Sequence, residues 1–259
     1  MSSRNRLSES GERRNMDGNL MLNQYYEAVV RNLETVFKTQ SANLSAAADL
    51  IFEALQNGGR FLVTGTGHSH MFAEEFYARA GGFAQVTPIL PGEFMLHEHP
   101  LKSTEVERIE SYAGVIMKLY KISAGDVLVI ASNSGRNGLT VELARLAGEA
   151  GAKVIAFTNP RRPAFETSRH SSGKYLHEYA DLVIDSGTEP GDAAILIPGI
   201  ELPMGATSTI IGAYTAQSIS ILLAEKYHEN HLIPPVFKSS NIEEGDAWNQ
   251  KLFAQYCGV

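Results

Sequence analysis

The sequence lacks the features that mark several specialised classes of protein. It has a single cysteine, Cys257, which excludes an intramolecular disulfide and a cysteine-rich metal site. No apolar run approaches the roughly 18 residues that a membrane-spanning helix needs, and the first residues contain no apolar signal core. We therefore expect a cytoplasmic protein in a reducing compartment, with no membrane partner.

Positive charge is also scarce. Lys and Arg number 22 against 29 Asp and Glu, which gives a formal net charge of −7 at pH 7. A surface that binds nucleic acid needs a basic face, so we expect no nucleic-acid partner. Apolar residues make up 44% and charged residues 20% of the 259 residues, as is ordinary for a globular protein with an ample core.

The first 19 residues differ from the rest of the chain. They contain four arginines and almost no large apolar side chains, so we expect residues 1–19 to form a disordered tail. A basic arm that contacts a partner is the alternative. Residues 20–259 contain no linker rich in Pro, Gly or Ser, which predicts a single domain with helical additions at both ends.

Short apolar runs alternate with helical patterns along the chain. The runs predict strands at 61–63, 84–90, 126–131, 153–157, 182–184 and 194–197. Helical spacing and end signals, among them Ser41 and the pair Thr104 and Glu107 as N-terminal caps, predict helices at 21–39, 41–55, 71–80, 104–120, 139–150 and 206–227. Such alternation implies right-handed βαβ units and a parallel sheet, so the predicted fold class is α/β.

Two polar loops directly follow two of the predicted strands. Residues 65–70 read GTGHSH and residues 132–138 read SNSGRNG, and a helix follows each loop. Ligands bind beyond the carboxyl ends of parallel strands, where free amides, a helix dipole and serine hydroxyls favour an anion. If the two strands are neighbours, the loops converge on one phosphate. The alternative is that serine and glycine merely make turns.

Nucleotide sites fit the sequence less well. The loop at 65–70 begins like a dinucleotide fingerprint but lacks the third glycine. A Walker loop needs Gly-Lys followed by Ser or Thr, and the sequence contains no such tripeptide. The two loops therefore favour a phosphate group that does not belong to a nucleotide.

The two loops resemble the signature loops of the SIS (sugar isomerase) family in spacing, preceding strands and following helices. The likeness covers roughly residues 45–225 and is closest to the phosphosugar-binding group related to phosphoheptose isomerase. It implies a flavodoxin-like, three-layer α-β-α sandwich with a five-stranded parallel sheet, to which this chain adds terminal helices. It also implies a sugar phosphate as ligand, and a homodimer or homotetramer with the site near the subunit interface.

The resemblance assigns phosphate contacts residue by residue. Ser69 falls on the first-loop serine, and Ser132 and Ser134 fall on the paired serines of the second loop. Asn137 stands where the family usually has Thr or Ser, so a polar donor is kept but the match is weaker there. Arg136 is unusual and either adds charge to the phosphate or points to solvent. The full predicted set is Ser69, Ser132, Asn133, Ser134, Gly135 and Asn137.

Many SIS proteins interconvert aldose and ketose phosphates without a redox cofactor, through an enediol(ate). This chemistry needs a base over the carbon that loses its proton and a donor near the carbonyl. Residues 72–75 read FAEE, and phosphoheptose isomerases have a similar segment whose second glutamate is catalytic. The resemblance thus nominates Glu75. Glu74 stays open as the base, because the FAEE segment follows the glycine loop one helical turn earlier here than in the family. A solvated helix face is the alternative for both.

The acid partner is harder to place. The family's late-helix histidine falls in residues 206–218, which contain no histidine. Histidine suits proton transfer near neutral pH; the candidates are His97 first, and then His99, His228 and His231. Residues 97–99 read His-Glu-His, the residue types that a zinc or nickel site uses, and His68 or His70 is the candidate for a further ligand. Structural histidines are commoner, so we expect no bound metal and no cofactor.

Two functions remain in view. The first is a cofactor-independent sugar-phosphate isomerase that acts through Glu75 and His97, and a related lyase or deaminase is a variant of it. The second is a non-catalytic phosphosugar-binding sensor or regulatory subunit, which the missing late-helix histidine favours. No helix-turn-helix extension is evident, which argues against a transcription factor.

Overall fold

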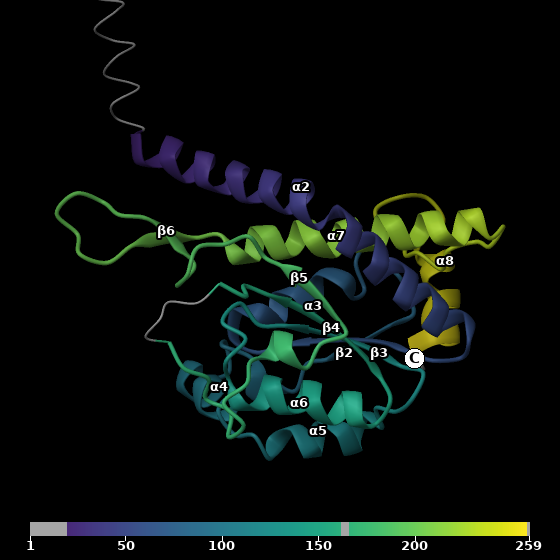
Figure 1. The fold of residues 1–259 in the computed structure, drawn as a ribbon. Helices are drawn as coiled ribbons and strands as arrows, with labels where there is room; N and C mark the ends of the chain where they lie inside the picture. The colour runs from purple at the N-terminus through teal and green to yellow at the C-terminus, as the bar shows by residue number, and fades with distance from the viewer. Residues whose placement is uncertain (1–19, 162–165, 258–259) are drawn as a thin grey trace, which may run out of the picture.

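The computed structural model describes residues 20–161 and 166–257, so the predicted disordered tail at 1–19 lies outside the described residues. Five strands form one parallel sheet (Figure 1). They are β1 (Phe61–Gly65), β2 (Val86–Ile89), β3 (Val127–Ala131), β4 (Lys153–Thr158) and β5 (Leu182–Asp185). The order is β2-β1-β3-β4-β5, which confirms the predicted five-stranded parallel sheet and makes β1 and β3 neighbours.

Helices cover both faces of the sheet, so the three predicted layers are confirmed (Figure 1). One face carries α2 (Leu20–Gln56), α3 (His70–Phe76) and α7 (Ser208–Glu229), and the other carries α5 (Tyr112–Tyr120) and α6 (Gly138–Glu149). Alternate residues of β3 point to opposite layers: Val127 and Val129 join the first core, whereas Leu128 and Ile130 join the second. Burial on both faces explains the uninterrupted apolar runs of β1 and β3.

The N-terminal helix differs from its prediction. Residues 20–56 form one continuous helix of 37 residues instead of two helices with a cap at Ser41. The hydroxyl of Ser41 donates to the carbonyl of Phe37, one turn back within the helix, so it cannot cap a new helix start.

The predicted helix at 104–120 is also wrong, because the chain forms α4 (Pro100–Val106) and then α5 after a turn. His99 is the N-cap of α4, where its Nδ1 accepts from the amide of Lys102 at 3.4 Å. Thr104 donates its hydroxyl to the carbonyl of Pro100, inside the helix. Proline at the first helical position suits this start, since its missing N–H would have no partner there.

Shorter elements complete the described chain. α3 ends at Phe76 rather than at residue 80, since Tyr77 is extended and Ala78 has a positive φ of 50°. The predicted strand at 194–197 is half of an antiparallel hairpin that pairs β6 (Ala193–Ile195) with β7 (Met204–Ala206). The rest are α8 (Gly245–Leu252), a π-helix at Phe253–Cys257, and the 3₁₀ turns η1 (Gly67–Ser69), η2 (Gly92–Phe94) and η3 (Leu176–Glu178).

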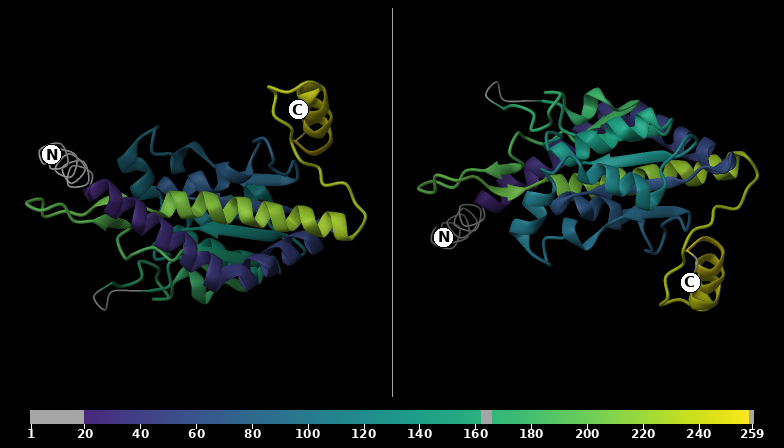
Figure 2. Two further views of the ribbon diagram at one scale, coloured as in Figure 1. Left: turned by 90° about the horizontal axis from the view of Figure 1, so that it is seen from above. Right: turned by 90° about the horizontal axis from the view of Figure 1, so that it is seen from below.

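The two ends of the molecule carry different additions (Figure 2). The β6–β7 hairpin and the start of α2 project together beyond the sheet, and the hydroxyl of Tyr25 donates to the carbonyl of Ala206 at 2.8 Å. α8 lies at the opposite end, and the segment before it pairs Val236 with Phe83. Among the helices of the described residues, none has the length and apolar character that a membrane span requires.

Candidate functional site

The two polar loops begin side by side at the carboxyl edge of the sheet. β1 and β3 pair in register up to Gly65 opposite Ala131, so the expected convergence of the loops is confirmed. The first loop folds back tightly over its own strand: a Cβ on Gly65 would lie 2.2 Å from the carbonyl oxygen of Ser69. Glycine is therefore required where this loop leaves β1.

The second loop is a turn that Ser132 closes from within. The hydroxyl of Ser132 accepts from the amide of Gly135 at 3.1 Å, and its own amide donates to the carbonyl of Phe157 at 3.0 Å. Gly135 has a positive φ of 55°, which a glycine adopts without steric cost. The buried Ser132 thus holds the loop in shape, and the loop presents the next side chains outward.

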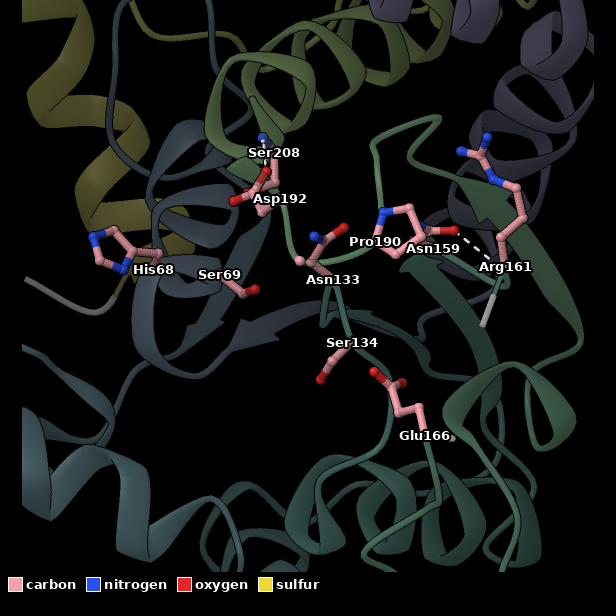
Figure 3. A pocket seen from close by; sticks show the side chains of 11 residues that line it. His68, Ser69, Asn133, Ser134, Asn159, Arg161, Glu166, Pro190, Asp192 and Ser208 are labelled. Carbon is pink, nitrogen blue, oxygen red and sulfur yellow. Dashed lines mark hydrogen bonds between the residues drawn. The ribbon is translucent and has the colours of Figure 1, made fainter. Parts of the chain in front are cut away.

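A cavity of about 290 Å³ lies at the point where the loops meet (Figure 3). Ser69 from the first loop and Asn133 and Ser134 from the second loop line it. Distant parts of the chain supply the remaining walls: His68, Asn159, Arg161, Glu166, Pro190, Gly191, Asp192 and Ser208. The cavity therefore brings together three of the predicted phosphate contacts.

The other three predicted contacts lie behind this surface. Ser132, Gly135 and Asn137 are buried and do not line the cavity. Asn137 immediately precedes α6, and its side-chain oxygen accepts from Nη1 of Arg169 at 2.7 Å.

Asn133 is held in one orientation. Its side-chain oxygen accepts from the hydroxyls of Ser186 at 3.1 Å and Thr188 at 2.9 Å, both at the end of β5. With that oxygen engaged, the amide NH₂ is the group that Asn133 can offer to a ligand as a donor. The neighbouring Arg161 donates to the carbonyl of Thr188 at 3.0 Å and lies 3.6 Å from Asp185.

The N-terminus of α7 forms a third wall of the cavity. The carboxylate of Asp192 accepts from the amides of Thr207 at 3.0 Å and Ser208 at 2.7 Å, and from the hydroxyl of Ser208 at 2.6 Å. A carboxylate at this position is stabilised by the free amides and the dipole of the 22-residue helix. Figure 3 shows Asp192 beside Ser208 above Asn133.

A carboxyl group lies where the two loops meet behind the cavity. Oε2 of Glu107 accepts from the hydroxyl of Thr66 at 2.9 Å. Burial raises the pKa of Glu107, while hydrogen bonds from Thr66 and Asn137 and the positive charges of Arg169 and Arg108 oppose that rise. A half-buried carboxyl with a raised pKa can exchange a proton closer to neutral pH than an exposed one.

The nominated base, Glu75, lies in the contact between α3 and α7. Its carboxylate accepts from Nε2 of Gln217 at 2.9 Å and forms an ion pair with Arg79. Gln217 belongs to the stretch of α7 in which the resemblance placed a histidine. Phe72, one turn earlier, stacks on Phe157 at 4.8 Å, and Glu75 does not line the cavity.

The nominated histidine, His97, is exposed on the loop before α4 and does not line the cavity either. His99 caps α4, and His70 contacts the carbonyl of Gly67. In residues 20–161 and 166–257, no group of three or more His, Cys, Asp or Glu side chains is arranged to hold a metal ion. The structure thus does not gather the His-Glu-His residues with His68 or His70.

Sequence reasoning missed most of the walls of the cavity. Asn159 directly follows β4, Pro190 lies in the segment after β5, and Ser208 begins α7. The rule that ligands bind beyond the carboxyl ends of parallel strands applies to β4 and β5 as much as to β1 and β3. Applied to every strand, it would have found Asn159, whereas no local signal marks Glu166 or Asp192.

Comparisons with known proteins agree with this architecture. The model of the SIS domain matches residues 24–159. UPF0309 protein BH3325 of Halalkalibacterium halodurans is 49% identical over 226 residues, which cover 87% of this chain and 93% of that protein. The chain therefore belongs to the SIS domain family and, within it, to the UPF0309 proteins.

Two solved structures share the fold at low sequence identity. A phosphoheptose isomerase from Francisella tularensis superposes with a TM-score of 0.54 at 15% identity, over 79% of this chain and 96% of that one. The NanR protein of Vibrio vulnificus, complexed with ManNAc-6P, gives a TM-score of 0.51 at 15% identity, over 92% of this chain and 69% of that one. At such identities the likeness concerns the fold alone.

Proposed function

We propose that this SIS domain protein binds a phosphorylated sugar in the cavity between the β1–α3 and β3–α6 loops. The observation that carries the proposal is the meeting of Ser69, Asn133 and Ser134 in one cavity at the carboxyl edge of a parallel sheet. Two hydroxyls and an amide give several neutral donors aimed at one volume, which is how a phosphate is oriented.

The remaining walls suit the sugar. Asn159, Glu166 and Asp192 line the same cavity, and their oxygens accept from hydroxyl groups. The fold neighbours support the ligand class, since one is a phosphoheptose isomerase and the other is complexed with ManNAc-6P. A ligand with a phosphoryl group at the loops and hydroxyls toward Asn159 satisfies both halves of the cavity.

The proposed reaction is aldose–ketose isomerisation through an enediol(ate), with Glu75 as base and His97 as acid. The phosphate anchor supplies remote binding energy that orients the reacting carbons. Since neither side chain lines the cavity of the free protein, this reaction requires α3 and the loop before α4 to approach the ligand when it binds.

The second candidate function is a non-catalytic phosphosugar-binding sensor or regulatory subunit. The position of Glu75 favours it, because Gln217 and Arg79 already occupy the carboxylate in the contact between α3 and α7. In that case the same cavity binds the ligand, and nothing happens to the sugar.

A thermal-shift screen of pentose, hexose, heptose and amino-sugar phosphates tests the binding proposal. We expect at least one of them to raise the melting temperature, and the double variant Ser69→Ala with Ser134→Ala to lose about 100-fold in affinity for it. Ser111→Ala is the matched control, because Ser111 is exposed and makes no side-chain capping bond. A screen without any shift, or a double variant with wild-type affinity, contradicts the proposal.

Exchange of the substrate proton with solvent deuterium, at the carbon beside the carbonyl, separates the two candidates. Isomerisation predicts exchange by the wild type and its loss in Glu75→Gln, with Glu74→Gln measured alongside because Glu74 is exposed on the same helix. A protein that binds the sugar phosphate without exchanging the proton is the sensor. Exchange that survives in Glu75→Gln removes Glu75 as the base.

We also propose a homodimer or homotetramer whose interface includes the hairpin surface, defined as the β6–β7 hairpin with the first turns of α2. Its large apolar side chains are exposed: Leu22 by 64%, Tyr26 by 68%, Leu196 by 63% and Leu202 by 73%. The hairpin follows directly on Asp192, so this interface would adjoin the cavity. Light scattering should give a multiple of 28.2 kDa for the wild type and a smaller particle for Leu196→Ser with Leu202→Ser.

A further inference from the structure

The cavity lining carries little net positive charge for a ligand that bears a phosphate. Arg161 lines the cavity, but it lies 3.6 Å from Asp185 and donates to a backbone carbonyl. Glu166 and Asp192 line the cavity as carboxylates. Because a phosphate monoester carries nearly two negative charges at neutral pH, neutral donors alone leave most of that charge uncompensated.

Arg136 belongs to the second loop itself, and Arg169 lies directly against that loop. The amide of Arg169 donates to the carbonyl of Arg136 at 2.9 Å. The backbones of these two residues are therefore adjacent, although they are far apart in the sequence. Nη1 of Arg169 donates to the side chain of Asn137 at 2.7 Å, at the residue that precedes α6. The guanidinium of Arg169 therefore lies at the N-terminal end of α6, where the helix dipole favours an anion, and the positive charge of Arg136 acts on it there.

These two arginines are not fully neutralised by the described residues around them. Burial and the positive charges of Arg136 and Arg108 lower the pKa of Arg169, although Glu107 and Glu166 act in the opposite direction. The Nε of Arg136 is buried and has no hydrogen-bond partner among the described residues. Its Nη1 lies 3.8 Å from Oε2 of Glu166, a distance too long for a hydrogen bond.

Glu166 connects this pair to the cavity. It lines the cavity together with Ser134, and Figure 3 shows its carboxylate directed toward the loop that carries Ser134. The guanidinium of Arg136 thus lies next to the cavity wall, on the side of Ser134. A buried donor without a partner, and two like charges held together, cost free energy in the free protein that an anionic group of the ligand would recover.

We propose that Arg136 and Arg169 are specificity-determining residues that supply the positive charge for the phosphoryl group of the ligand. The hydroxyls of Ser69 and Ser134 orient the phosphoryl oxygens, and the two guanidinium groups at the start of α6 compensate their charge. A guanidinium fork matches phosphate geometry and forms hydrogen bonds about twice as strong as those of neutral donors. This inference rests on the proposed phosphosugar binding, which it deepens.

The test measures affinity against salt concentration for Arg136→Gln, Arg169→Gln and Arg169→Lys. The probes are inorganic phosphate and the sugar phosphate that gives the largest thermal shift with the wild type. Arg31→Gln is the matched control, since it removes the same charge from an exposed position on α2, where the guanidinium of Arg31 lies 3.9 Å from the carboxylate of Glu27.

We expect each Gln variant to lose about 10-fold to 100-fold in affinity. Its affinity should also depend less steeply on salt than that of the wild type, because a charge that faces the phosphate is gone. Arg169→Lys should recover the salt dependence and part of the affinity, and Arg31→Gln should change neither quantity.

A purely structural role for the pair predicts a different pattern. The variants would then unfold at lower temperature and lose affinity with an unchanged salt dependence, and that result overturns the inference. Wild-type affinity in both Gln variants also overturns it, while leaving phosphosugar binding intact. A wild type that binds no sugar phosphate instead refutes the proposed function, and this inference falls with it.

Discussion

The two ends of β3 both carry charged side chains, but the two clusters are organised in opposite ways. At the amino end, the buried carboxylate of Asp126 accepts from the backbone amide, Nε and Nη2 of Arg60, and from the amide of Ser123. Burial by itself would raise the pKa of Asp126, yet these hydrogen bonds and the charge of Arg60 outweigh it and hold the pKa below its usual value.

At the carboxyl end the balance is reversed. Burial raises the pKa of Glu107 against the groups that oppose it, and burial with two neighbouring arginines lowers the pKa of Arg169. Glu107 and Arg169 are each held in an environment that disfavours their charge, whereas Arg60 favours the charge of Asp126. The amino end therefore stabilises the sheet, whereas the carboxyl end has the perturbed pKa values that are typical of functional sites.

The largest expected effect on stability comes from removing the charge of Asp126 at the amino end of β3. Asp126→Asn removes the charge that four donors address, and we expect it to lower the free energy of unfolding by roughly 3 kcal/mol at neutral pH. Because the folded-state pKa is lowered, this stabilisation is present above the usual value of 3.8 and is lost as the pH falls below it. Urea unfolding of both proteins at neutral and acidic pH measures the difference, which should shrink in acid.

The next largest effect compares two serines of the second loop, Ser132, which holds the loop in shape, and Ser134, which lines the cavity. Ser132→Ala leaves the buried amide of Gly135 without its acceptor, so we expect a loss of about 1–2 kcal/mol in unfolding free energy. Ser134→Ala should change stability by less than about 0.5 kcal/mol, because its hydroxyl faces the cavity. Equal destabilisation by both variants would mean that Ser134 also supports the loop.

The smallest expected effect is the pH dependence of stability that Glu107 causes. It runs in the opposite direction to that of Asp126, because the pKa of Glu107 is raised and that of Asp126 is lowered. A carboxyl whose folded-state pKa is raised contributes stability at low pH that is lost as the pH rises above its usual value of 4.5. The stability of the wild type relative to Glu107→Gln should therefore decline from acidic to neutral pH. A parallel pH dependence of the two proteins in urea unfolding would show that Glu107 does not titrate abnormally.

Local patterns predicted the sheet better than the helices around it. The strands of the parallel sheet lie within two residues of their predicted bounds, because buried apolar runs flanked by turns leave little choice. Ser41 and Thr104 misled the helix boundaries, since a serine or threonine hydroxyl caps a helix or donates one turn back with equal ease. Which of these it does depends on what packs beside it.

The sequence by itself determined the α/β fold and the two polar loops, because strand periodicity, glycine conformation and serine hydroxyls are local properties. Only the tertiary structure decided which side chains share the cavity. The pairing of β1 with β3 gathers Ser69 and Ser134, and the close approach of distant segments adds Glu166 and Asp192. It also separates Ser132, which holds the loop in shape, from Ser134, which lines the cavity, since identical residues two positions apart point to different surroundings.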